Sequence, residues 1–125
     1  MLALFSVEKF EAQYKEALMD QTFDAMIECW FLVTLCNDDH EPTGEVLWGI
    51  VIDDQKRRFQ PGHYVCTSSI IEHITPSLFR TMNTVYKCVG QGKFVTMNIQ
   101  DLNGLRQGFS PEEIKLVAGL QRKSH

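Results

Sequence analysis

The chain has 125 residues, of which 44% are apolar, 22% charged and 10% aromatic, values typical of an ordinary globular domain. At this length folding buries about two-thirds of the surface of the unfolded chain, so a stable core needs neither disulfides nor a metal. No run of about 18 apolar residues is present for a membrane span, and the first five residues lack the features of a signal peptide. We therefore expect one domain over residues 1–125 that is cytoplasmic, contacts no membrane and keeps its thiols reduced.

The net charge of −4 is unevenly distributed along the chain. Residues 1–62 contain 12 acidic and 5 basic side chains, whereas residues 63–125 contain 4 acidic and 7 basic ones. Nucleic-acid binding needs clustered cations, so nucleic acid is not an expected partner. The balance favours a protein partner with a basic patch. A homodimer, in which the acidic half of one copy meets the basic half of another, is the weaker possibility.

A first helix is predicted near the N-terminus, where Ser6 can cap a helix that begins at Val7. Apolar residues then recur at three- and four-residue steps, at Val7, Phe10, Tyr14, Ala17 and Leu18. Acidic residues occupy other positions of the same segment. We consider Glu8, Glu11 and Glu16 as candidates for partner binding, the alternative being a solvated helix face.

The middle of the chain is rich in strand signals. Apolar runs over residues 29–35 and 46–52 predict two buried strands, and residues 64–67 predict a third. Between the second and third strands, Gln60-Pro61-Gly62-His63 suits a type II turn. These segments predict an antiparallel hairpin or meander.

The second half of the chain is predicted to hold more strands and a last helix. Thr75-Pro76 is typical of the start of a short helical turn. Strands over residues 84–89 and 94–99 flank a glycine-containing turn and predict a second hairpin. Ser110-Pro111-Glu112-Glu113 is a capping box that begins a C-terminal helix. The predicted fold class is α+β, a small antiparallel sheet of four or five strands flanked by N-terminal and C-terminal helices.

A cationic segment stands out as a candidate binding site. Lys56, Arg57, Arg58 and Phe59 place three cations beside an aromatic ring at the tip of a predicted hairpin, where they could hold an acidic surface. A solvated turn is the alternative interpretation. Trp30 and Trp48 are candidate interface anchors, but both lie in apolar runs, which favours core packing.

A metal site is the sharpest chemical alternative. Cys36, His40, His63 and Cys66 would supply two thiolates and two imidazoles, as zinc requires. The spacing matches no common zinc-finger pattern, and on a regular strand His63 and Cys66 would point to opposite faces. No signature of a catalytic nucleophile surrounds these residues, and adjacent Asp53 and Asp54 are explained by a turn. No cofactor and no catalytic residue are therefore predicted.

One segment resembles a known family. The run from Trp48 to Asp53, followed by the run from Arg58 to Ser68, resembles the core of a small uncharacterised protein family of bacteria and their phages. The resemblance assigns no site residues and implies a bacterial or prophage origin. The sequence thus favours a non-enzymatic protein-binding protein, inhibitory or adaptor in role. The alternative is a small metalloprotein or enzyme centred on the Cys and His residues named above.

Overall fold

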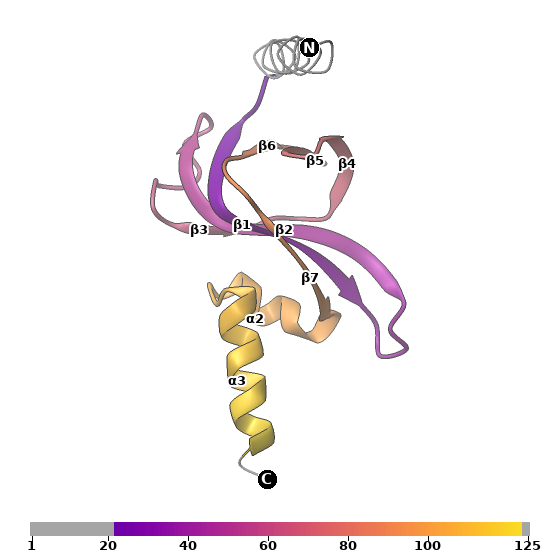
Figure 1. Ribbon diagram of the computed structural model, residues 1–125. Coiled ribbons are helices and arrows are strands. Elements are labelled where there is room, and N and C mark those ends of the chain that lie inside the picture. Colours follow the sequence, from indigo (N-terminus) through magenta and orange to yellow (C-terminus); the bar gives the residue numbers. More distant parts are fainter. Residues whose placement is uncertain (1–21, 124–125) are drawn as a thin grey trace, which may run out of the picture.

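The computed structural model of the protein describes residues 22–123 (Figure 1). The helix predicted from Val7, with Glu8, Glu11 and Glu16, lies outside these residues. Within them the chain forms seven strands, one 3-10 helix and two α-helices: β1 (Ala25–Cys36), β2 (Pro42–Asp54), β3 (Tyr64–Cys66), β4 (Ile70–Thr75), β5 (Leu78–Thr81), β6 (Val85–Cys88), β7 (Lys93–Asn98), η1 (Ile99–Asp101), α2 (Leu102–Arg106) and α3 (Pro111–Lys123). The α+β class is confirmed, and so is the C-terminal helix. The sheet is larger than predicted.

The first three strands form the predicted antiparallel meander, with β2 between β1 and β3. The turn before β3 also agrees with the prediction. The N–H group of His63 donates to the carbonyl of Gln60 over 3.1 Å, and Gly62 has a φ of +88°, which a type II turn requires at that position.

The predicted hairpin between β6 and β7 is wrong, because these strands do not pair with each other. Both pair with β1 in parallel: β6 along residues 25–27 and β7 along residues 31–36. The link between them passes around Trp30, whose indole N–H donates to the carbonyl of Gly90 over 3.1 Å. A Cβ atom on Gly92 would lie 2.4 Å from the Trp30 ring, so only glycine allows this close crossing. The sheet is therefore mixed, with two parallel pairings.

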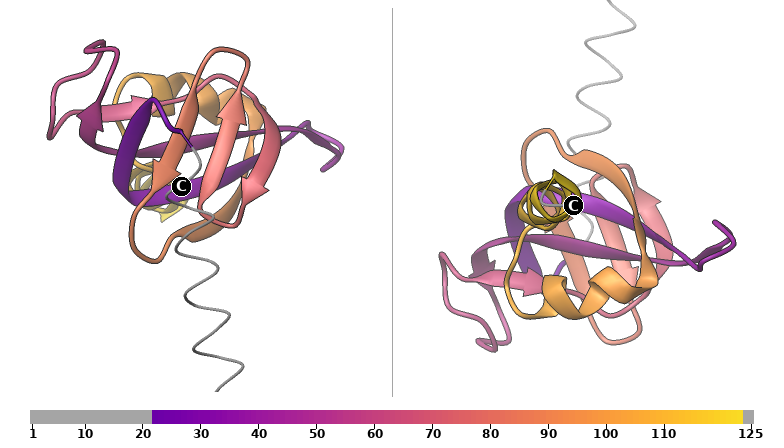
Figure 2. Two further views of the ribbon diagram at one scale, coloured as in Figure 1. Left: turned by 90° about the horizontal axis from the view of Figure 1, so that it is seen from above. Right: turned by 90° about the horizontal axis from the view of Figure 1, so that it is seen from below.

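The helical turn predicted at Thr75-Pro76 is also wrong. Thr75 ends β4 and Leu78 begins β5, so Pro76 lies in the turn of an antiparallel hairpin. The Thr75 hydroxyl accepts a hydrogen bond from the N–H of Ser77 over 3.2 Å, which stabilises that turn. This hairpin continues the sheet beyond β6 and accounts for the two strands missing from the prediction. Figure 2 shows β4, β5 and β6 curling over β1 and β2.

A bulge divides β1 between two apolar layers. Cys29 adopts a φ of +50°, and the pairing with β2 shifts by one residue between Glu28 and Phe31. Ala25, Ile27, Trp30 and Leu32 therefore face one buried cluster, enclosed by β4 to β6. Phe31, Val33 and Leu35 face a second cluster, on the side of α2 and α3.

The C-terminal helices cover the second layer only in part. Leu105 of α2 is fully buried, and Ile114 of α3 packs against the same cluster. The capping box is confirmed: the N–H of Glu113 donates to Ser110 Oγ, and the N–H of Ser110 donates to Glu113 Oε1. Helix α3 extends away from the sheet toward the C-terminus (Figure 1). No helix within residues 22–123 has the length and apolar content to cross a membrane.

Candidate functional site

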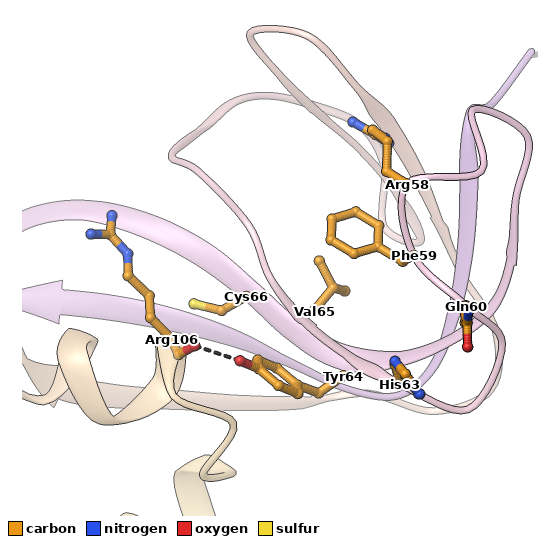
Figure 3. A pocket seen from close by; sticks show the side chains of 8 residues that line it. All are labelled: Arg58, Phe59, Gln60, His63, Tyr64, Val65, Cys66 and Arg106. Carbon is orange, nitrogen blue, oxygen red and sulfur yellow. Dashed lines mark hydrogen bonds between the residues drawn. The ribbon is translucent and has the colours of Figure 1, made fainter.

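A cavity of about 560 Å³ lies between the β2–β3 loop, β3 and the end of α2 (Figure 3). It brings together four of the residues singled out in the sequence: Arg58, Phe59, His63 and Cys66. The remaining lining residues are Gln60, Tyr64, Val65 and Arg106. Two arginines and a histidine thus line the cavity, and none of the eight lining residues is acidic. We call it the cationic cavity.

Asp54 fixes the loop that forms one wall of the cavity. Its carboxylate accepts hydrogen bonds from the backbone N–H groups of Lys56, Arg58 and Phe59 at 3.1, 2.8 and 3.0 Å. Burial of this side chain raises its pKa, but the hydrogen bonds from Arg58 and from the three N–H groups outweigh burial. The net result is a pKa of Asp54 below its ordinary value, so Asp54 is charged at neutral pH.

Two of the three predicted cations hold this loop against the β5–β6 turn. Arg58 Nε and Nη2 lie 3.4 and 3.5 Å from the Asp54 carboxylate, and Nη1 donates to Thr84 Oγ1 over 2.8 Å. Lys56 Nζ donates to the carbonyl of Asn83 over 2.7 Å and lies 3.8 Å from the Asp24 carboxylate. The cationic segment is therefore partly structural.

The third cation, Arg57, is exposed and adopts a φ of +55°. Its side chain makes no hydrogen bond or ion pair within residues 22–123. Since its neighbours on either side are bound internally, Arg57 does not act together with them as one patch of three free charges. Phe59 packs beneath Arg58, whose guanidinium lies 5.3 Å from the centre of the phenyl ring.

Tyr64 positions the opposite wall of the cavity. Its hydroxyl donates to the carbonyl of Arg106 over 2.5 Å, and its ring stacks on Trp48 with 6.2 Å between the ring centres. A Cβ atom on Gly108 would lie 2.9 Å from the Tyr64 ring, so glycine is required at that position, where φ is +108°. These contacts place the end of α2 beside β3.

Arg106 brings a positive charge to the site. Its side chain is exposed, and the guanidinium has no hydrogen-bond or ion-pair partner in the part of the chain that the structure describes. Figure 3 shows it at the side of the cavity next to Cys66. An unpaired guanidinium beside a cavity without carboxylates is suited to bind an anionic group.

Cys66 is not an activated nucleophile. Burial raises the pKa of its thiol to about 11, although the charge of Arg106 acts in the opposite direction. At neutral pH roughly one thiol in ten thousand would be ionised, whereas a reactive cysteine needs a substantial thiolate population. Cys66 therefore contributes surface and volume to the cavity.

The four predicted metal ligands fall into two separate pairs. Cys36 and His40 line a hollow at the end of the β1–β2 hairpin, while His63 and Cys66 line the cationic cavity. Within the described residues no three Cys, His, Asp or Glu side chains come together in a group that could hold a metal ion. All four cysteines are free thiols.

Both tryptophans belong to the core, as the sequence favoured. The candidate residues that sequence analysis missed are Tyr64 and Arg106. Tyr64 was predicted only as part of a strand. Arg106 lies in α2, a short helix that neither apolar periodicity nor a capping residue in the sequence predicted. Their association depends on the approach of α2 to β3, which joins residues 42 positions apart.

A family model for a domain of unknown function, DUF6957, matches residues 6–103. The chain belongs to this family. The resemblance to a small uncharacterised family is thereby confirmed. No curated protein and no solved structure matches the chain.

The DUF6957 match covers the whole sheet and the loop organised by Asp54. It ends within α2, before Arg106, and does not include α3. Seven of the eight residues that line the cavity are thus in the matched region, whereas Arg106 belongs to the segment that follows it.

Proposed function

We propose that this DUF6957 member is a non-enzymatic protein-binding protein whose cationic cavity receives an acidic segment of its partner. The observation that supports this proposal most directly is the Arg106 guanidinium, which has no partner within residues 22–123 and lies beside a cavity whose eight described lining residues include no carboxylate. A partner carboxylate placed there gains a charged hydrogen bond. The Phe59 and Tyr64 rings offer apolar contact to the rest of the segment.

The rigidity of the cavity also supports binding. The loop from Lys56 to Phe59 is fixed by a buried carboxylate, and Tyr64 ties α2 to the sheet. A site fixed before binding loses less conformational entropy when the partner arrives. The raised pKa of Cys66 argues against a nucleophilic reaction at the same place.

We further propose that the protein acts in the cytoplasm of a bacterium, as an inhibitor or adaptor encoded by the host or a prophage. The four free thiols are compatible with that reducing setting. The bacterial or prophage origin is supported by the sequence resemblance alone.

Fluorescence anisotropy with labelled hexaglutamate tests the proposed cavity. We expect binding that weakens with added salt, and an affinity about fivefold lower for Arg106→Gln, which corresponds to about 1 kcal/mol for an exposed charge pair. Arg57→Gln is the matched control, because it removes the same charge at a position of the wall loop that does not line the cavity, and it should leave the affinity nearly unchanged.

Equal losses in both arginine variants would show nonspecific attraction and contradict the proposal. So would stronger binding of labelled oligothymidylate than of hexaglutamate, since that result would identify the cavity as a nucleic-acid site.

A further inference from the structure

Helix α3 carries several large apolar side chains that are exposed in the structure of residues 22–123. Ile114 packs against Gly104 and the second apolar layer, but the side chains of Leu116, Val117 and Leu120 are 66%, 49% and 59% exposed. These three positions are separated by one, three and four residues, so they share one side of the helix. Three large apolar side chains gathered on one helix face indicate a contact surface.

The same face is hollowed next to Val117. A groove of about 250 Å³ lies there, between α3, Asp101 and Phe109, and Phe109 is itself 48% exposed. An apolar side chain from a second helix could enter this groove, as in helix packing generally. The groove and the exposed residues together make a surface suited to an amphipathic helix.

The charges of α3 define what that helix should be like. Glu112 pairs with Lys93, and Glu113 belongs to the capping box, so the acidic first turn is engaged within the chain. From Lys115 onward the helix sequence contains three basic residues and no acidic one. The occupant of this face should therefore be apolar on one side and acidic on the other.

Such a segment is present in the chain itself. Residues 6–20 lie outside the described residues, and their sequence places Val7, Phe10, Tyr14 and Leu18 at helical spacing beside four acidic residues. Fifteen residues make a helix of about 22 Å, and the 13 residues of α3 span about 20 Å. The two segments are thus matched in length, apolar pattern and charge.

The position of β1 indicates which copy of the chain supplies the segment. The first residues of β1 pack in the layer enclosed by β4 to β6, whereas α3 packs on the opposite layer (Figure 1). Only residues 21–24 lie between the segment and Ala25, too few to pass around the sheet to α3. A second copy has no such restriction.

We propose that residues 6–20 of a second copy bind the apolar face of α3, so that two copies exchange these segments in a two-fold symmetric dimer. Because the exchange forms the same contact twice, the area buried between the two copies is twice that of one contact. A stable interface buries roughly 1,200–2,000 Å² in total, and the second contact brings the dimer closer to that range. The proposal does not rest on the cationic cavity, because α3 is not among the elements that line it.

Sedimentation velocity of the full chain at 1–200 µM tests the exchange. The expected mass is about 29 kDa, twice the 14.4 kDa of one chain. Phe10→Asp and Leu116→Asp should each give monomers, because one alters the bound segment and the other its surface. Met82→Asp is the matched control. Met82 is 78% exposed on the β5–β6 turn, which belongs to neither the bound segment nor α3, so this variant should remain dimeric.

Circular dichroism establishes that each variant is folded, and neither Leu116 nor Met82 belongs to either apolar layer. A monomeric wild-type chain at 200 µM would overturn the proposal. A dimer that Leu116→Asp disrupts and Phe10→Asp leaves intact would also overturn it, because α3 would then be covered by something other than residues 6–20. Dissociation of the Met82→Asp dimer would place the interface elsewhere and overturn it as well.

Discussion

Replacement of Asp54 by asparagine should destabilise the protein by about 3 kcal/mol. The Asp54 carboxylate has no exposed area, accepts three backbone N–H groups and faces the Arg58 guanidinium. Hydrogen bonds to a charged acceptor contribute about 1.5–3 kcal/mol each. Asparagine keeps one acceptor oxygen but directs an NH₂ group toward donors, so about two of these bonds are lost, with incomplete additivity.

The same network predicts a pH dependence. Because the folded pKa of Asp54 lies below the ordinary value of about 3.9, its contribution to stability is fully present above that value. The contribution is lost as the pH falls through the folded pKa. The difference in unfolding free energy between wild type and Asp54→Asn should therefore be constant from pH 5 to 8 and decrease below about pH 4.

Urea unfolding followed by tryptophan fluorescence measures both effects. Asp53→Asn is the matched control, because the neighbouring Asp53 is exposed and makes no side-chain hydrogen bond within the described residues, so its loss should cost less than about 0.5 kcal/mol. If Asp54→Asn costs under 1 kcal/mol at pH 7, or if its cost grows as the pH falls, the carboxylate does not organise the loop as argued.

Two further predictions concern close packing and thiol chemistry. Gly92→Ala should cost about 1–3 kcal/mol in urea unfolding, because the new methyl group would lie 2.4 Å from the Trp30 ring. Gly119→Ala is the control: no atom of the described residues lies within 4 Å of the added methyl group, so the change should be neutral or stabilising. Equal effects of the two substitutions would contradict the role of Gly92 in packing. Exposed Cys29 should react with iodoacetamide at pH 8 well before Cys66, whose pKa is raised to about 11. Peptide mass spectrometry measures the order of labelling, and preferential labelling of Cys66 would refute the burial of its thiol.

Local sequence patterns were sufficient for β1, β2, β3 and the start of α3. In each case the signal is short-range: an apolar run, a Pro-Gly turn or a capping box that acts within a few residues. The α+β class follows from these elements. The C-terminal helix was predicted correctly because both hydrogen bonds of its cap join Ser110 and Glu113, three positions apart.

Strand pairing was predicted less well because it depends on partners distant in the sequence. The glycines between β6 and β7 form a pattern typical of a hairpin turn. In the structure they allow the link between the two strands to pass around Trp30, and both strands pair with β1. Thr75-Pro76 has the residue types of a helix start and also those of a turn. The pairing of β4 with β5 decides between these possibilities. The residues around Thr75 contain no pattern from which that pairing could be predicted.

The candidate site shows the same limit. Lys56, Arg57 and Arg58 are equivalent in the sequence as cations, but Asp24 and Asp54 engage only the first and the third. Asp24 is 32 positions away from Lys56, so its role could not be inferred from the run of charges. The cavity is also lined by Arg106, which lies 42 positions after Tyr64 in the sequence and is brought beside β3 only by the fold.

The bulge at Cys29 has a consequence for insertions and deletions within β1 of this chain. Side chains alternate between the two faces of a strand, and the one extra residue sets Trp30 and Leu32 in phase with Ala25 and Ile27. Removing a single residue here would turn Phe31, Val33 and Leu35 into the space now filled by the other layer. Both layers would lose their packing at once, so the length of β1 is constrained more tightly than the identity of any one of its residues.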